Sequence, residues 1–198
     1  MNMFFSMRHL IFLTLWLTSY LVFPLLNFHF QPVPLANFLG FMALIFYMMT
    51  LAPSILRKVF PKIRSDKMLI LLLKNRRNIG IASYVLASNH GLLMVISRDI
   101  DLLNSYTYIH YFQGISAFFI MSLLTITSND VSVKYLKKNW RKIHQLTYLL
   151  IFILPWHILD KMSGHWTYLT ILSVFICFMC IYLFIKRMIL ENVVERSR

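Results

Sequence analysis

Acidic residues are scarce in this sequence, and so is charge in general. Only seven Asp and Glu stand against twenty Lys and Arg among 198 residues, and charged residues make up 14% of the chain. A soluble domain carries about a quarter charged residues. No acidic residue lies inside a long apolar run, which excludes a catalytic triad or a pair of carboxylates buried in such a run.

Cysteine and glycine are also few, with two Cys and five Gly. Cys177 and Cys180 lie in the apolar stretch "CFMC", where a thiolate is strongly disfavoured. We therefore interpret them as small apolar packing residues rather than as a redox pair. No disulfide framework is implied. There is no glycine-rich nucleotide loop, so the sequence predicts no flavin or nicotinamide domain.

Apolar side chains dominate instead, at 59% of the residues. Runs of about twenty such residues recur, which is the length that crosses a bilayer. We predict an all-α integral membrane protein, a six-transmembrane-helix bundle that forms a single domain over residues 1–198. The predicted spans are Arg8–Leu26, Leu35–Leu56, Asn78–Ile96, Tyr106–Ile126, Lys142–Leu159 and Trp166–Ile185. The segment from Lys67 to Arg77 is too short to span, and we expect an interfacial helix there that leads into the third span.

The net charge of +13 is distributed as in a membrane protein. A basic chain can indicate nucleic-acid binding, but here the basic residues lie in short loops between apolar runs, so no nucleic-acid partner is predicted. Eighteen of the twenty Lys and Arg fall on one side of the predicted membrane, and only Arg98 and Lys161 fall on the other. The positive-inside rule then places both the N- and C-termini in the cytoplasm.

Seven histidines are the most informative residues. His9, His29, His110 and His165 lie at or near predicted span ends, where an interfacial polar tip is the expected role. His90, His144 and His157 lie within spans. An ionisable group inside a membrane is costly and usually functional, although each could instead make an interhelical hydrogen bond.

Two of these three histidines are predicted to lie at the same depth. His90 follows Arg77 by 13 residues and His157 follows Lys142 by 15, which is about 20 Å and about 22 Å along a helix. Both spans run outward, so both imidazoles reach the outer half of the membrane. His144 lies near the cytoplasmic face.

Two imidazoles at one level can ligate a heme iron from both sides. The third span supports this with a face of small residues that precedes the ligand: Gly80, Ser83 and Ala87, with Gly91 beside His90. A flat macrocycle could approach the backbone there, although helix packing leaves the same pattern. Zinc fits less well, because a structural zinc site needs four ligands and this level offers two.

These residues resemble a known family. The stretches "RRNIGIASYVLASNH", "LLTITSND" and "WRKIHQLTYLLIFILPWH" are similar to the ferric reductase-like transmembrane domain. They are most similar to its small stand-alone branch, the heme-binding subunits (MsrQ) of bacterial methionine sulfoxide reductase systems. The resemblance covers about Arg76 to His157.

The resemblance implies a b-type heme and electron transfer across the cell inner membrane. His90 and His157 match family heme ligands, and His144 matches a third histidine implicated in heme binding. Larger relatives pair histidines on both helices and hold two hemes. Here Arg77 stands thirteen residues before His90, so a second heme would lack its usual partner for His144, and the number of hemes stays open.

The resemblance also implies partners. The flavin and nicotinamide domain of the larger relatives is not found, so electrons are expected from a cytoplasmic flavin reductase or from quinol, and FMN or a quinone is a further candidate cofactor. The expected acceptor is an outer-side protein such as a periplasmic molybdenum-containing methionine sulfoxide reductase. The chain would then be an electron-transfer subunit of an oxidoreductase system. A membrane ferric reductase subunit and a non-redox scaffold or transporter subunit remain alternatives.

Overall fold

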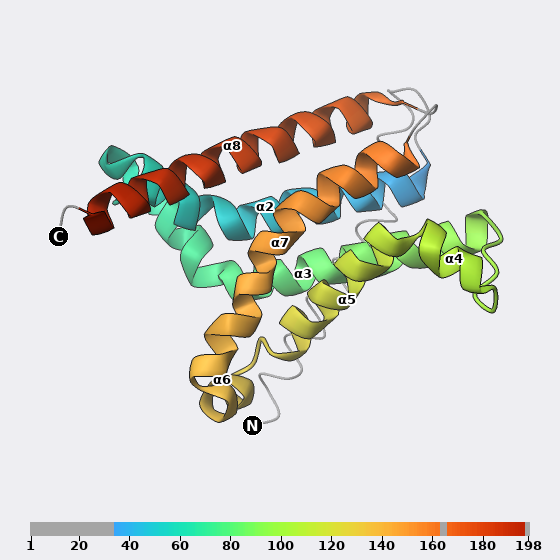
Figure 1. Ribbon diagram of the computed structural model, residues 1–198, viewed down its shortest axis with the longest axis horizontal. Helices are drawn as coiled ribbons and strands as arrows, with labels where there is room; N and C mark the ends of the chain where they lie inside the picture. Colours follow the sequence, from blue (N-terminus) through green and yellow to red (C-terminus); the bar gives the residue numbers. More distant parts are fainter. Residues whose placement is uncertain (1–33, 163–165, 197–198) are drawn as a thin grey trace.

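The computed structural model describes residues 34–162 and 166–196, and all the regular elements in these ranges are helices. In chain order they are α2 (Leu35–Val59), the short 3-10 helix η1 (Pro61–Ile63), α3 (Lys67–Ser97), α4 (Ser105–His110), α5 (Phe112–Ile126), α6 (Asp130–Leu136), α7 (Lys138–Lys161) and α8 (Tyr168–Arg196). Figure 1 shows the long helices packed side by side, with α4 at one end of the bundle and α6 toward the other. The first predicted span, Arg8–Leu26, lies outside the described residues.

Four of these helices, α2, α3, α7 and α8, are long and apolar enough to cross a membrane. A fifth span is added if α5 and α6, which meet at a bend of 92°, are counted as one. The four helices coincide with the second, third, fifth and sixth predicted spans. The chain is therefore a multi-pass, all-helical membrane protein.

The helix α3 begins earlier than its predicted span. The carboxylate of Asp66 caps it by accepting hydrogen bonds from the backbone N–H groups of Met68 and Leu69 at 2.8 and 3.1 Å. A short acceptor side chain at this position satisfies backbone donors that have no partner within the helix. The predicted interfacial segment and the third span therefore form one unbroken helix.

The fourth predicted span, Tyr106–Ile126, is not a single helix, because it is interrupted at Tyr111 between α4 and α5. In an unbroken helix the carbonyl of His110 would accept from the N–H of residue 114. Here it accepts a hydrogen bond from the ammonium of Lys161 on α7, which also lies 4.9 Å from the centre of the Tyr111 ring. A side chain from a distant helix therefore competes for this carbonyl, which local sequence cannot show.

The core is centred on α2, which packs against both α3 and α8, while α7 packs against α5 and α8. Leu51 on α2, Leu150 and Ile151 on α7, and Cys177 on α8 are all 0% exposed. Cys177 is thus a core packing residue, as predicted. The hydroxyl of Tyr47 donates to the Thr147 carbonyl, which ties α2 to α7 by a buried hydrogen bond.

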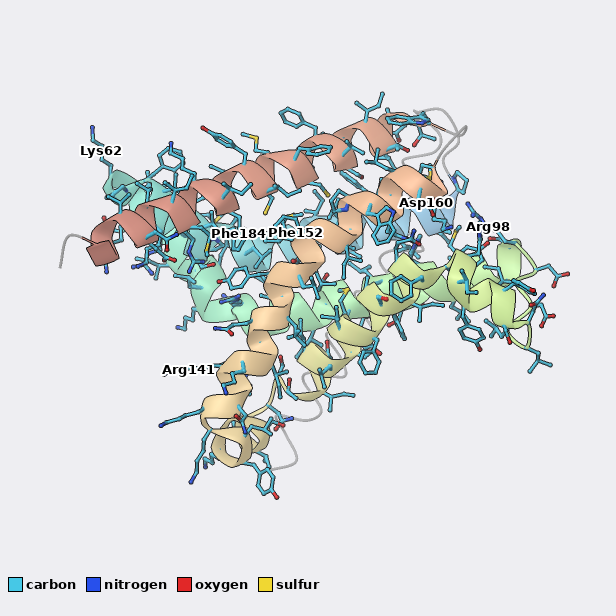
Figure 2. The ribbon with its side chains drawn as sticks, viewed as in Figure 1. Lys62, Arg98, Arg141, Phe152, Asp160 and Phe184 are labelled. Carbon is cyan, nitrogen blue, oxygen red and sulfur yellow. The ribbon has the colours of Figure 1, made fainter. Side chains whose placement is uncertain are left out.

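Charged residues lie toward the two ends of the bundle, and the end with Lys62 and Arg141 is called the basic end (Figure 2). Figure 2 shows Lys62 and Arg141 toward one end of the molecule and Arg98 and Asp160 toward the other. The basic end also carries the network in which Glu191 binds Arg187 at 3.1 Å and Lys58 at 3.6 Å. This separation agrees with the loop asymmetry in the sequence.

Candidate functional site

His90 on α3 and His157 on α7 lie next to each other. Their ring centroids are 6.4 Å apart and their planes cross at 81°. Both rings line a cavity of about 620 Å³ that also reaches α2, α5 and α8, a volume in the range of small-molecule and cofactor sites. The two imidazoles that the sequence predicts at one level are therefore neighbours in the bundle.

The ring of His90 is fixed by α2. Its Nδ1 atom lies 2.7 Å from the carbonyl oxygen of Ala36. Because a carbonyl can only accept a hydrogen bond, Nδ1 carries the proton and Nε2 keeps a free lone pair. This is the arrangement that orients a metal-binding histidine and increases its basicity.

His157 is held differently. Its Nδ1 atom is buried and has no hydrogen-bond partner among residues 34–162 and 166–196. The helix α7 continues through Pro155, two residues earlier, and proline removes one backbone hydrogen bond from that turn. The position of this ring therefore depends on packing.

Two glycines that sequence reasoning missed make room for the two rings. A Cβ atom at Gly40 would lie 2.9 Å from Nδ1 of His90, and one at Gly114 would lie 3.0 Å from Cε1 of His157. Both distances are shorter than a side chain tolerates without movement of the ring. The scarcity of glycine was the available signal, since each glycine inside a predicted span calls for a packing or functional reason.

The small-residue face of α3 divides between two roles. Ser83 is buried and donates a hydrogen bond of 2.7 Å to the Ala43 carbonyl of α2. A Cβ atom at Gly80, one turn earlier, would lie 3.7 Å from Cγ2 of Thr50 on α2. These two residues serve helix packing, whereas Ala87 and Gly91 line the cavity.

Space remains open beside His90. A Cβ atom at Gly91 would meet nothing within 4 Å. The other cavity walls are mainly apolar side chains, among them Leu44, Phe118 and Leu154. Two cationic residues, Arg98 and Lys161, line the cavity as well, and both belong to the end of the bundle that carries few basic residues. The cavity is thus an apolar chamber with charge only toward one end.

His144 is not part of this site. It lies on α7 thirteen residues before His157, which is about 20 Å along the helix. Its Nε2 is 3.2 Å from the hydroxyl of Thr127, and its ring stacks on Trp140 with centroids 4.1 Å apart. Arg77, thirteen residues before His90, forms a salt bridge with Asp130 at 2.7 Å.

His110 is the one remaining histidine among the described residues, and it does not line the cavity. His110 is exposed at the end of α4, and its ring contacts Tyr111. His9, His29 and His165 lie outside the described residues.

The pair of imidazoles fits a metal held from two sides. An imidazole nitrogen binds a transition metal at about 2 Å and lies about 1 Å from the centre of its ring, so two rings that share one ion have centres about 6 Å apart. The observed 6.4 Å agrees with this spacing. Within the described part of the chain there is no group of three or more His, Cys, Asp and Glu that could hold a metal ion. A metal at this position would have His90 and His157 as its ligands from the described residues.

Comparison with known proteins identifies a family. The family model described as "Ferric reductase like transmembrane component" matches residues 39–155. The matched range runs from α2 to Pro155 of α7, so it contains His90 and His144 and ends two residues before His157. No solved structure matches the chain.

Proposed function

The chain belongs to the family of ferric reductase-like transmembrane components, and from this premise we propose that it is a b-type heme subunit that carries electrons through the membrane. The observation that carries the proposal is the pair of imidazoles, His90 and His157, whose ring centroids are 6.4 Å apart and which both line an apolar cavity. Bound heme would supply one-electron redox chemistry at this position.

The residues of the chain would hold the heme and form its surroundings. His90 and His157 would be the two axial ligands, with the Ala36 carbonyl holding the tautomer of His90. The glycines at 40, 91 and 114 would leave room for the rings and the macrocycle, and the apolar walls would exclude water. Arg98 and Lys161 would offer positive charge to the carboxylates of the bound group.

We also propose the topology: six spans, with both termini in the cytoplasm of a bacterial inner membrane. His144 then lies on the cytoplasmic side and the paired histidines in the outer half. Electrons would pass outward from a cytoplasmic flavin reductase or from quinol, and FMN or a quinone would serve as a further cofactor. The outer acceptor would be a periplasmic molybdenum-containing methionine sulfoxide reductase, as for the MsrQ branch.

Heme content of purified histidine variants tests the ligand assignment. His90→Ala and His157→Ala should each lower heme per protein well below the wild type, because each removes one of two ligands in an apolar cavity. His144→Ala should lower it less, since this ring lies about 20 Å away. His110→Ala is the matched control and should leave heme content unchanged. The measurement is a pyridine hemochrome assay after heme-sufficient expression. Full heme in both His90→Ala and His157→Ala would refute the assignment.

Proteoliposomes of known orientation test the direction of electron transfer. A reductant confined to the cytoplasmic side should reduce the heme, and an acceptor on the opposite side should reoxidise it. Reduction only from the outer side would contradict the proposed direction. A wild-type protein without b-type absorption bands would leave a scaffold or transporter subunit as the better interpretation.

A membrane ferric reductase subunit is the second candidate function, favoured by the description of the matching family. It shares the heme and the fold and differs in the acceptor. Dithionite-reduced protein freed of excess reductant should distinguish the two. Rapid reoxidation by a ferric chelate, with none by an oxidised periplasmic methionine sulfoxide reductase, would favour the ferric reductase.

A further inference from the structure

We infer that the two histidines are unequal, and that His157 is the ligand that a small external molecule such as carbon monoxide can replace. The inference rests on the proposed function, because it concerns how these residues would hold the heme. A site for a small ligand would then lie on the His157 side of the cavity, with His90 as the permanent ligand.

His90 is fixed by a hydrogen bond. The bond of 2.7 Å from Nδ1 to the Ala36 carbonyl sets both the tautomer and the plane of the ring. This carbonyl belongs to α2, the helix at the centre of the core, so the backbone that holds the ring is itself well packed.

His157 lacks this constraint. Its Nδ1 has no hydrogen-bond partner in the described ranges, although it is buried. The two rings are alike in their glycine contacts, since Gly114 of α5 adjoins His157 as Gly40 of α2 adjoins His90. The helix that carries His157 contains Pro155, and α5 is separated from α4 by the interruption at Tyr111. Among the described residues, no hydrogen bond through Nδ1 fixes the rotation of this ring or increases the basicity of its other nitrogen.

The chemical consequence is a difference in bond strength. A hydrogen bond from the distal nitrogen of a ligating histidine to a carbonyl typically changes metal affinity by about 10- to 100-fold. Among the described residues, His90 has such a bond and His157 does not. His157 would therefore be the residue that yields its place on the iron to a competing ligand.

Hemin titration of apo-protein variants tests whether His90 contributes more to heme binding than His157 does. His90→Ala should weaken hemin binding at least about tenfold more than His157→Ala does, relative to the wild type. Both variants are first checked for a monodisperse elution profile, and His110→Ala is the control. Equal losses, or a larger loss for His157→Ala, would overturn the inference while leaving the two-ligand proposal intact.

Carbon monoxide binding gives a second measurement that needs no substitution. The dithionite-reduced wild-type protein should take up carbon monoxide, with the shift in its absorption bands that replacement of an axial histidine produces. A variant His157→Ala that retains added hemin should bind carbon monoxide faster, because no internal ligand has to leave. A reduced wild-type protein that carries heme but takes up no carbon monoxide would overturn the inference. A wild-type protein that binds no heme would overturn the proposed function and the inference together.

Discussion

At the residue scale, Gly40 and Gly114 leave free the space beside the two imidazole rings that a side chain at either position would partly occupy. Each brings the backbone of a neighbouring helix within contact distance of one imidazole ring. Glycine normally destabilises a helix interior by about 1 kcal/mol relative to alanine. Its use at these two positions therefore indicates that the space beside the rings matters more than helix propensity.

Alanine substitution at these glycines should separate stability from heme binding. Gly40→Ala and Gly114→Ala each place a methyl group about 3 Å from a ring atom, so we expect the rings to be displaced and heme content to fall. Gly80→Ala is the matched control, because its methyl group would meet only Thr50 at an ordinary 3.7 Å. That variant should keep its heme and gain up to about 1 kcal/mol from helix propensity. Heme per protein and thermal unfolding in detergent measure the two effects. Unchanged heme in both Gly40→Ala and Gly114→Ala would show that the rings can move without loss of binding.

The hydroxyl of Tyr47 is the second residue whose role can be isolated. It makes a buried hydrogen bond to the Thr147 carbonyl between α2 and α7, and such a bond contributes about 1 kcal/mol net. Tyr47→Phe should therefore lower the free energy of unfolding by about this amount, with heme content preserved. Tyr182→Phe serves as the control, since the Tyr182 side chain is 63% exposed on the outer face of α8. Equal thermal stability of the two variants would contradict the assigned role.

At the scale of the elements, helix positions could be predicted and helix interruptions could not. The apolar runs predicted α2, α3, α7 and α8, because a span needs a fixed number of apolar residues. The common depth of His90 and His157 followed from helix rise counted from the flanking cations. In contrast, the interruption at Tyr111 involves Lys161, which is fifty residues away. The hydrogen bond of His90 to Ala36 likewise joins two helices, so neither sequence stretch reveals it.

Lys137, the residue between α6 and α7, has a strained backbone conformation. Its backbone has φ 48° and ψ −116°, a region that L side chains rarely adopt and that costs about 1–3 kcal/mol. Lys137→Gly should therefore raise the free energy of unfolding by about 1 kcal/mol, because glycine adopts this conformation without steric cost. Lys134→Gly, in the interior of α6, should lower it. Thermal unfolding in the same detergent compares the two, and destabilisation by Lys137→Gly would argue that the lysine side chain has a stabilising contact of its own.

At the scale of the whole molecule, the separation of charge predicts the orientation in the membrane. Lys62 and Arg141 lie toward the basic end and Arg98 toward the opposite end (Figure 2). Single cysteines at Lys62 and Arg141, in a background without Cys177 and Cys180, should be protected from an impermeant maleimide in intact cells. A single cysteine at Leu103, which is 95% exposed between α3 and α4, should react. Labelling of all three after cell lysis is the control. The reverse pattern in intact cells would place the paired histidines near the cytoplasm and invert the proposed direction of electron flow.

The packing of α8 on α2 has a consequence for biosynthesis. These are the last and the first of the described helices, and they are in contact in the finished bundle. About 110 residues separate the end of α2 from the start of α8, and at typical elongation rates their synthesis takes roughly 5–20 s. During that interval one face of α2 is not yet covered by α8. The ion pair between Lys58 and Glu191, 3.6 Å apart in the complete bundle, cannot yet form. Closure of the bundle is therefore a late event in translation, and a ribosome that stalls before α8 leaves an incomplete bundle as a substrate for membrane quality control.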